Sequence, residues 1–192
     1  MRQPYMRGLE DAILCAREFV DDEPFGVILG DDVVYNGDGE PALHQLIRQY
    51  EKTGTTIVGC QLVAKEQVSS YGIIDGKPER DSDLMKVSDM IEKPSVVKAP
   101  SRFVALGRYV ITPYIFSILE ESKPGKGGEI RLTDALRVLA RNGKVYAYNF
   151  KGQRYDTGNK LGYLKAVVEF ALRREDLGAD FRAYLKEIVG AM

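Results

Sequence analysis

The sequence predicts a mixed α/β fold in which a mostly parallel sheet is flanked by helices. Short segments rich in β-branched residues alternate along the chain with amphipathic segments at helical spacing. The chain has 192 residues, of which 44% are hydrophobic, and this is enough to bury a core around such a sheet. The alternation continues without an internal repeat, so we expect residues 1–192 to form a single domain that ends in helices over residues 160–192.

The first third of the chain contains two expected helices and two expected strands. Apolar residues of Leu9–Val20 recur at helical spacing, and Phe25–Leu29 is a short apolar run that stops at a polar turn, as a buried strand does. The second helix carries an apolar stripe over Leu43–Tyr50 and closes at Gly54, a residue typical of helix C-caps. Thr55–Val63 is rich in β-branched residues and is expected to be an interior strand.

The remaining elements are predicted in the same way. Extended segments are expected at Tyr71–Ile91, Phe103–Ile111 and Val145–Phe150. A polar surface loop at Gly76–Asp83 is expected to interrupt the first of them. Helices are expected from Pro113, which suits a first turn, to about Glu121, and at Leu132–Ala140, Lys160–Arg174 and Phe181–Val189. A loop is expected at Lys123–Gly128. The apolar stripe of the C-terminal helices packs either into the core or into a subunit interface; it includes Leu164, Val167, Val168 and Ala171.

Composition excludes several classes of function. Lys and Arg total 27 against 28 Asp and Glu, so bulk positive charge cannot drive nucleic-acid binding. No apolar run approaches the roughly 20 residues of a membrane span, and we expect a cytoplasmic protein whose Cys15 and Cys60 are ordinary core residues. His44 is the only histidine, which argues against a Ser-His-Asp triad or a zinc site of the usual ligand count. Chemistry here must use carboxylates, lysines, backbone amides and a hard metal ion.

Two acidic motifs are candidates for a metal site. Gly30-Asp31-Asp32 follows an expected strand, at the end of a sheet where ligands bind in open α/β folds, although the same residues are good turn formers. Asp156 precedes an expected helix and is either its N-cap or a second metal ligand. If the two motifs meet at one sheet edge, their carboxylates suit Mg²⁺, which takes oxygen ligands and keeps waters for phosphates.

Three further motifs are less specific. Glu92-Lys93-Pro94 offers a carboxylate for sugar hydroxyls and an ammonium for phosphate, or is an exposed pair at a strand end. Tyr71-Gly72 marks either a close backbone approach to a ligand or a β-bulge. Gly128–Ala135 opens a helix, so capping by Thr133 and an early-turn Asp134 explain much of it.

The order of these motifs is more specific than any one of them. They occur in the sequence and spacing of one family: Gln3 with Gly8-Leu9, Leu29–Asp32, Tyr71-Gly72, Glu92–Pro94, Gly107–Tyr109, Gly128–Ala135 and Asp156–Tyr163. The chain resembles the bacterial UTP–glucose-1-phosphate uridylyltransferases, also called UDP-glucose pyrophosphorylases, over essentially all of its length. Residues 129–135 and 156–163 are the most specific blocks and distinguish this branch from thymidylyl- and adenylyl-transferring relatives.

The resemblance implies a nucleotidyltransferase (Rossmann-like) fold and the reaction of UTP with glucose-1-phosphate to give UDP-glucose and pyrophosphate, a step of carbohydrate metabolism. It implies Mg²⁺ as the cofactor, held by Asp31 and Asp156, and a homo-oligomeric enzyme. In-line attack of the sugar phosphate on the α-phosphorus needs charge neutralisation and positioning rather than a protein nucleophile.

By the same resemblance, the substrates contact residues from distant parts of the chain. Gln3 and the Gly8 backbone are implied to read the uracil edge. Gly72 and Glu92 are implied to bind the glucose hydroxyls, and Lys93 the sugar phosphate, so that Lys93 joins the two aspartates as a catalytic residue. Gly107 is implied to lie along the sugar pocket.

The chain departs from the family pattern in two places. Near the uracil site the family has Gly-Leu-Gly where this chain has Gly8-Leu9-Glu10, and a glutamate there could crowd or repel a nucleotide. The family's N-terminal segment, with its Gly-x-Gly-Thr-Arg signature and Pro-Lys-Glu motif, is not in this sequence. We therefore expect a C-terminal portion of the fold with its N-terminal strands missing and with impaired activity. We also expect an exposed sheet edge that causes oligomerisation or marginal stability.

Two alternatives remain open from the sequence. One is a non-catalytic sugar-nucleotide-binding or regulatory homologue, which both departures favour. The other is a related sugar-phosphate nucleotidyltransferase for another base or sugar.

Overall fold

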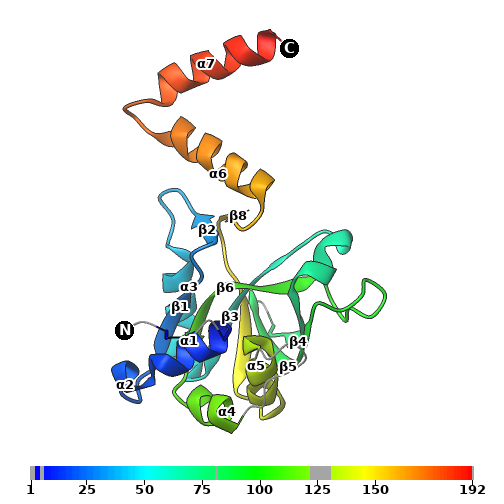
Figure 1. The fold of residues 1–192 in the computed structure, drawn as a ribbon. Helices are drawn as coiled ribbons and strands as arrows, with labels where there is room; N and C mark the ends of the chain where they lie inside the picture. The colour runs from blue at the N-terminus through cyan, green and yellow to red at the C-terminus, as the bar shows by residue number, and fades with distance from the viewer. Residues whose placement is uncertain (1–2, 5–6, 81, 122–130, 192) are drawn as a thin grey trace.

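The computed structural model describes residues 3–4, 7–80, 82–121 and 131–191. The loop predicted at 123–128 lies outside these residues, as does the first part of the block at 129–135. Six strands of the described chain form one sheet, in the order β1 (Phe25–Ile28), β6 (Phe103–Ile111), β3 (Thr56–Leu62), β7 (Val145–Asn149), β5 (Leu84–Glu92) and β4 (Gly72–Pro78). Helices flank this sheet, as the sequence predicts (Figure 1).

The expectation of mostly parallel strands is wrong for the described part of the chain. Of the pairings in its six-stranded sheet, only β3 with β7 is parallel, and the others are antiparallel. The reason lies in the connections, because a parallel pair needs a long crossover. Among the residues that the structure describes, no helix lies between β4 and β5, which pair as an antiparallel hairpin, or between β5 and β6.

Two apolar clusters form the core. One contains the buried side chains of α1 (Leu9–Cys15), α4 (Ile115–Glu121) and α5 (Leu132–Arg141), and the other those of α3 (Ala42–Thr53) and the 3₁₀ helix η1 (Lys65–Ser70). The strands of the sheet contribute to both clusters. The helix expected over Leu9–Val20 is interrupted at Ala16, whose N–H bonds to the carbonyl of Ile13 three residues back, and resumes as α2 (Arg17–Val20).

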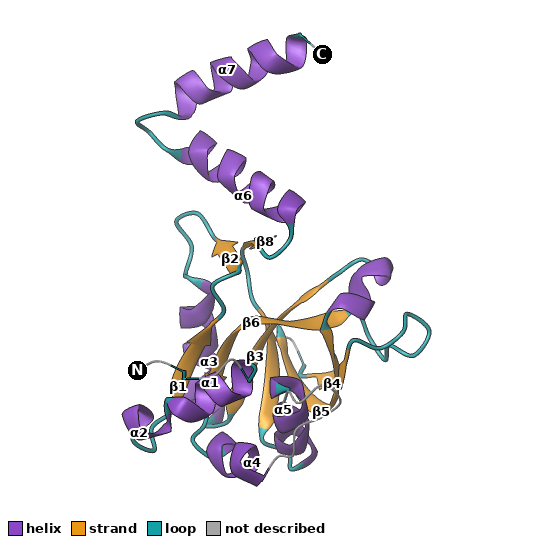
Figure 2. Ribbon diagram, viewed as in Figure 1, coloured by secondary structure: helices purple, strands orange, loops and turns teal. Residues whose placement is uncertain are grey.

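A second, two-stranded sheet joins β2 (Asp32–Tyr35) to β8 (Gln153–Asp156). It is followed by α6 (Lys160–Arg173) and α7 (Gly178–Gly190), which stand away from the six-stranded sheet (Figure 2). The core role considered for the stripe of α6 is wrong for two of its members, since Leu164 is 58% exposed and Val167 is 45% exposed. No described helix is long and apolar enough to cross a membrane.

Candidate functional site

The two acidic motifs meet because β2 and β8 pair with each other. The strands are antiparallel, with Asp32 directly opposite Asp156. The residues next to this pair are also joined, because the N–H and the hydroxyl of Thr157 both donate to the carbonyl oxygen of Asp31, at 2.8 and 3.0 Å. The β2–β8 pairing therefore brings together residues that are 124 and 126 positions apart in the sequence.

The carboxylates of Asp31 and Asp156 face a common gap beside Gly158. Asp156 Oδ1 and Asp31 Oδ2 each lie 3.2 Å from the point where a side chain at Gly158 would begin. Asp156 Oδ1 also accepts a hydrogen bond from the Gly158 N–H at 3.1 Å. Asp156 does not cap α6, because Asn159 does so by accepting from the Gly162 N–H at 2.7 Å.

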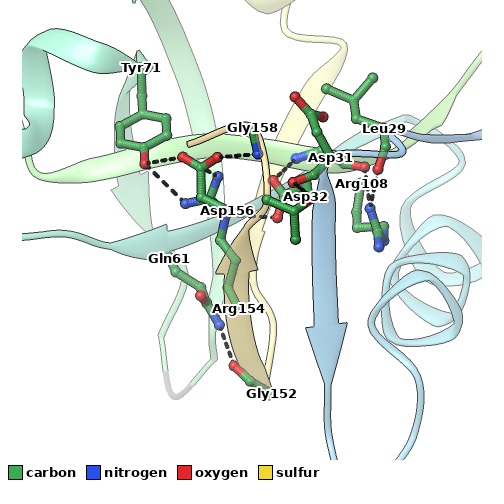
Figure 3. A network of polar contacts seen from close by, with 12 residues as sticks. Leu29, Asp31, Asp32, Gln61, Tyr71, Arg108, Gly152, Arg154, Asp156 and Gly158 are labelled. Carbon is green, nitrogen blue, oxygen red and sulfur yellow. Dashed lines mark hydrogen bonds and ion pairs between the residues drawn. The ribbon is translucent and has the colours of Figure 1, made fainter. Parts of the chain in front are cut away.

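Asp32 has a different environment from its neighbour Asp31. Its side chain is 6% exposed, and both of its carboxylate oxygens are used. Oδ1 accepts from Arg154 Nε at 2.7 Å and Oδ2 accepts from the Gly107 N–H at 2.8 Å, as Figure 3 shows for Asp32 and Arg154. The structure thus separates the two adjacent aspartates, leaving Asp31 exposed at the gap.

Arg154 links Asp32 to Asp156 through Tyr71. Arg154 Nη1 donates to the Tyr71 hydroxyl at 3.1 Å, and that hydroxyl donates to Asp156 Oδ2 at 3.2 Å (Figure 3). Arg154 Nη2 also lies 3.7 Å from Asp156 Oδ2. Burial disfavours the charged guanidinium, but the hydrogen bonds to Asp32 and Tyr71 outweigh this effect and raise the pKa of Arg154.

These side chains form the wall of a cavity of about 300 Å³, which we call the aspartate pocket. Its lining includes Asp31, Tyr71, Lys93, Gly107 and Asp156. A second cavity of about 330 Å³, the glutamate pocket, is lined in part by Gly8, Glu10, Gly72, Glu92, Lys93 and Thr133. Lys93, Ala105 and Tyr109 belong to both linings, so the two pockets adjoin.

The glutamate pocket contains a tight corner at Gly72, which has no side chain. Gly72 lies opposite Glu92 in the β4–β5 pairing, and a Cβ at Gly72 would lie 3.2 Å from Glu92 Oε2 and 3.1 Å from Thr133 Oγ1. Thr133 donates to Glu92 Oε2 at 2.7 Å and so holds this carboxylate in place. The glycine leaves the space beside Glu92 open on the pocket side.

Lys93 has an unusual backbone. Its φ is 44°, in the left-handed region that non-glycine residues seldom adopt, and the Pro94 that follows restricts it further. Its N–H donates to the Tyr71 carbonyl at 3.0 Å, while its Nζ lies 3.7 Å from Glu92 Oε1. Strained conformations of this kind cluster at functional sites.

Gln3 and Gly8 lie together at the start of α1. Gln3 Nε2 donates to the Gly8 carbonyl at 3.2 Å and to Asp11 Oδ2 at 2.6 Å. Gly8 has φ 107°, which requires a residue without a side chain. Next to it, Glu10 is 5% exposed and forms part of the glutamate pocket, so the glutamate that departs from the family pattern lies in the wall of the site.

Gly107 lies in the aspartate pocket rather than beside Gly72 and Glu92. The neighbouring Tyr109 is buried, and burial together with the nearby Asp32 and Glu92 raises the pKa of its phenol, which therefore stays neutral. Arg108 donates from Nη1 to the carbonyls of Leu29 and Gly107, and burial lowers the pKa of its guanidinium. These contacts tie β6 to the turn that carries Asp31.

The aspartate pocket fits a hard divalent cation. Two carboxylate oxygens face the gap beside Gly158, and Mg²⁺ is commonly held by one or two carboxylates and completed by waters and substrate phosphates. Among the described residues, no group of three or more His, Cys, Asp or Glu side chains forms a closed metal cluster. The arrangement suits a metal shared with a phosphate-bearing substrate.

Sequence reasoning did not assign four residues of this site. Asp32, Tyr71 and Thr133 belong to predicted motifs and Arg154 to none, but none of the four was given its role in the site. Each acts through partners that only the folded chain brings close. The adjacent carboxylates of Asp31 and Asp32 were a partial signal, since two aspartates after one glycine seldom share one role.

Comparison with known proteins gives a consistent picture. A family model described as nucleotidyl transferase matches residues 1–172. UTP–glucose-1-phosphate uridylyltransferase 1 of Staphylococcus saprophyticus subsp. saprophyticus is 44% identical over 98% of this chain and 64% of its own length. UTP–glucose-1-phosphate uridylyltransferase 2 of Streptococcus pyogenes is 42% identical over 100% of this chain and 65% of its own length.

Solved structures agree with these relatives. A UDP-glucose pyrophosphorylase complexed with UDP-glucose superposes with a TM-score of 0.86 at 43% identity, covering 91% of this chain and 66% of the other. A UTP-bound UGPase from Acinetobacter baumannii gives a TM-score of 0.88 at 35% identity, covering 97% of this chain and 64% of the other. The chain therefore spans slightly less than two thirds of the length of the relatives it matches.

Proposed function

The chain belongs to the nucleotidyl transferase family, and from this premise we propose that it carries the sugar-phosphate and metal half of a UTP–glucose-1-phosphate uridylyltransferase. The reaction is UTP plus glucose-1-phosphate to UDP-glucose plus pyrophosphate. The convergence of Asp31, Asp156 and Lys93 on one pocket is the observation that supports it best. The names of the relatives, at 42–44% identity, supply the choice of nucleotide and sugar.

The glutamate pocket is proposed to hold the glucose ring. The Glu92 carboxylate, fixed by Thr133, accepts hydrogen bonds from sugar hydroxyls, and the missing side chain at Gly72 leaves room for the ring to approach. The Gly8 backbone and Gln3, which lie together at the start of α1, are proposed to recognise the uracil base.

Lys93 is proposed to bind the phosphate of glucose-1-phosphate. Because Lys93 is the charged residue common to both pockets and is 60% exposed along its side chain, its ammonium can reach a phosphate between them. Its charge reduces the repulsion between the attacking phosphate oxygen and the α-phosphate of UTP. Lys93 follows the last residue of β5 and has a left-handed backbone, a strained conformation of the kind that clusters at functional sites.

Asp31 and Asp156 are proposed to hold Mg²⁺, which when bound would neutralise charge that develops on the phosphates. The two carboxylates would hold this ion in the pocket that Lys93 also lines, and Tyr109, whose phenol is neutral, lines both pockets. No protein nucleophile is needed, because the sugar phosphate attacks the α-phosphorus directly and pyrophosphate leaves in line.

A non-catalytic sugar-nucleotide-binding homologue is the second candidate, and one observation favours it. Glu10 is buried in the wall of the glutamate pocket, two residues after the Gly8 backbone that is proposed to contact the base. Such a protein keeps the sugar pocket and binds UDP-glucose without turnover.

Calorimetric titration tests the proposal. The purified chain is titrated with UDP-glucose in the presence of Mg²⁺, and an Asp156→Asn variant is measured in parallel. We expect binding that weakens about 10- to 100-fold in the variant. A folded chain that binds no UDP-glucose would contradict the proposal. Release of pyrophosphate from UTP and glucose-1-phosphate then separates the enzyme from the non-catalytic homologue, and other nucleoside triphosphates test the choice of base.

A further inference from the structure

Arg154 and Tyr71 form a directed hydrogen-bond chain that ends on Asp156. A guanidinium can only donate, so Arg154 Nη1 must give its hydrogen to the Tyr71 oxygen, at 3.1 Å. An ionised carboxylate can only accept, so the Tyr71 hydroxyl must give its own hydrogen to Asp156 Oδ2, at 3.2 Å. The chemistry of the two ends therefore leaves the tyrosine proton a single orientation (Figure 3).

Arg154 is itself held by a buried partner. Its Nε donates to Asp32 Oδ1 at 2.7 Å, and Asp32 is fixed in turn through Oδ2 by the Gly107 N–H at 2.8 Å. The side chains of Arg154 and Asp32 are 16% and 6% exposed, so water screens this ion pair weakly. This series of hydrogen bonds is thus anchored in β6 and β2, and it ends on Asp156, the last residue of β8.

We propose that Arg154 and Tyr71 are positioning residues that orient the Asp156 carboxylate towards the metal gap it shares with Asp31. With Oδ2 of Asp156 engaged by Tyr71 and Arg154, Oδ1 is the oxygen that faces Asp31 Oδ2 beside Gly158. The inference rests on the proposed function, because it concerns the same metal site.

The same network accounts for the division of labour between the two adjacent aspartates. Both carboxylate oxygens of Asp32 accept hydrogen bonds, from Arg154 and from the Gly107 N–H, whereas the Asp31 carboxylate lies at the gap. Asp32 therefore serves the site by holding the arginine that holds Asp156. Hydrogen-bond partners that orient metal ligands typically contribute 10- to 100-fold to metal affinity.

The experiment measures binding of Mn²⁺ alone by electron paramagnetic resonance, using the parent chain and three variants. Tyr71→Phe removes only the bridging hydroxyl, and Arg154→Lys keeps the charge but cannot serve three partners with one planar fork. Arg137→Lys is the matched control, because Arg137 also bonds an aspartate through Nε, at 2.6 Å from Asp89, and lines neither pocket. Circular dichroism verifies that each variant is folded.

We expect Tyr71→Phe and Arg154→Lys to weaken Mn²⁺ binding about tenfold or more, with Arg137→Lys unchanged. Folded Tyr71→Phe and Arg154→Lys variants that bind Mn²⁺ as tightly as the parent would overturn this inference and leave the proposed function standing. Equal weakening in Arg137→Lys would overturn it as well, because the effect would then be general. A parent chain that binds no Mn²⁺ would overturn both this inference and the proposed metal site.

Discussion

Replacing Gly107 by alanine is expected to destabilise the fold at the point where β6 meets the aspartate turn. A Cβ at Gly107 would lie 2.8 Å from the Cβ atoms of both Leu29 and Asp32, well inside the roughly 3.5 Å at which carbon atoms make favourable contact. Neither neighbour can yield easily, because the Leu29 N–H donates to the Gly107 carbonyl at 2.9 Å and Asp32 is bonded to the Gly107 N–H.

The size of the effect follows from these two contacts. Overpacking costs about 1–3 kcal/mol. Complete loss of the hydrogen bond between the charged Asp32 side chain and the Gly107 N–H would cost about 1.5–3 kcal/mol more. Because movement that relieves the clash also lengthens the bond, we expect a combined loss of about 3 kcal/mol in the free energy of unfolding.

Urea denaturation followed by circular dichroism measures this loss, with Gly30→Ala as the matched control. Gly30 lies in the same turn, but a Cβ there meets nothing within 4 Å. The control is expected to stay within about 0.5 kcal/mol of the parent. If Gly107→Ala is as stable as Gly30→Ala, the described contact between β6 and the aspartate turn is wrong.

Three further predictions concern separate parts of the chain. Lys93→Gly relieves a strained left-handed backbone (φ 44°), so the free energy of unfolding should stay the same or rise by about 1 kcal/mol. UDP-glucose binding should weaken, because the lysine charge is lost. A clear loss of stability in thermal melts would contradict the strain argument. A hydrogen bond from Arg137 lowers the pKa of Asp89 from 3.8 to about 2, so its contribution to stability is complete above about pH 4 and is lost as the pH falls towards 2. Between pH 4 and pH 2, the free energy of unfolding should fall less steeply in Asp89→Asn than in the parent chain. Equal dependence of the two free energies on pH would refute this. Burial raises the pKa of the Cys60 thiol, so Ellman's reagent should label it only after denaturation; rapid labelling of Cys60 in the folded chain, located by mass spectrometry, would show that β3 is exposed.

Local signals were sufficient for most individual elements. The strand over Phe103–Ile111 has the predicted bounds, and Gly54 caps α3 in the left-handed conformation that its position suggested. The hydrophobic period and the cap residue are properties of neighbouring residues, so a single sequence reveals them. The short strands β2 and β8 were not predicted as a pair, because each has only 4 residues and neither forms without the other.

Strand direction illustrates the limit of such signals. Alternating helices and strands favour parallel pairing, yet β4, β5 and β6 follow one another without a helix and pair antiparallel in this sheet. The apolar stripe of α6 is a similar case, because Leu164 and Val167 repeat at helical spacing but remain exposed. A periodic apolar pattern identifies which face of a helix is apolar, whereas the rest of the fold decides whether another element covers that face.

By itself, the sequence determined the class of chemistry, the candidate residues and the family, because these depend on residue types and on their order along the chain. The tertiary structure alone decided that Asp31 rather than Asp32 faces the gap, since the two neighbours differ only in their partners. It also gave a role to Arg154, which belongs to no motif, and to the hydroxyl of Tyr71, which the Tyr71-Gly72 motif did not indicate. Their roles arise from the pairing of β2 with β8, a contact across more than 100 residues that local periodicity cannot encode.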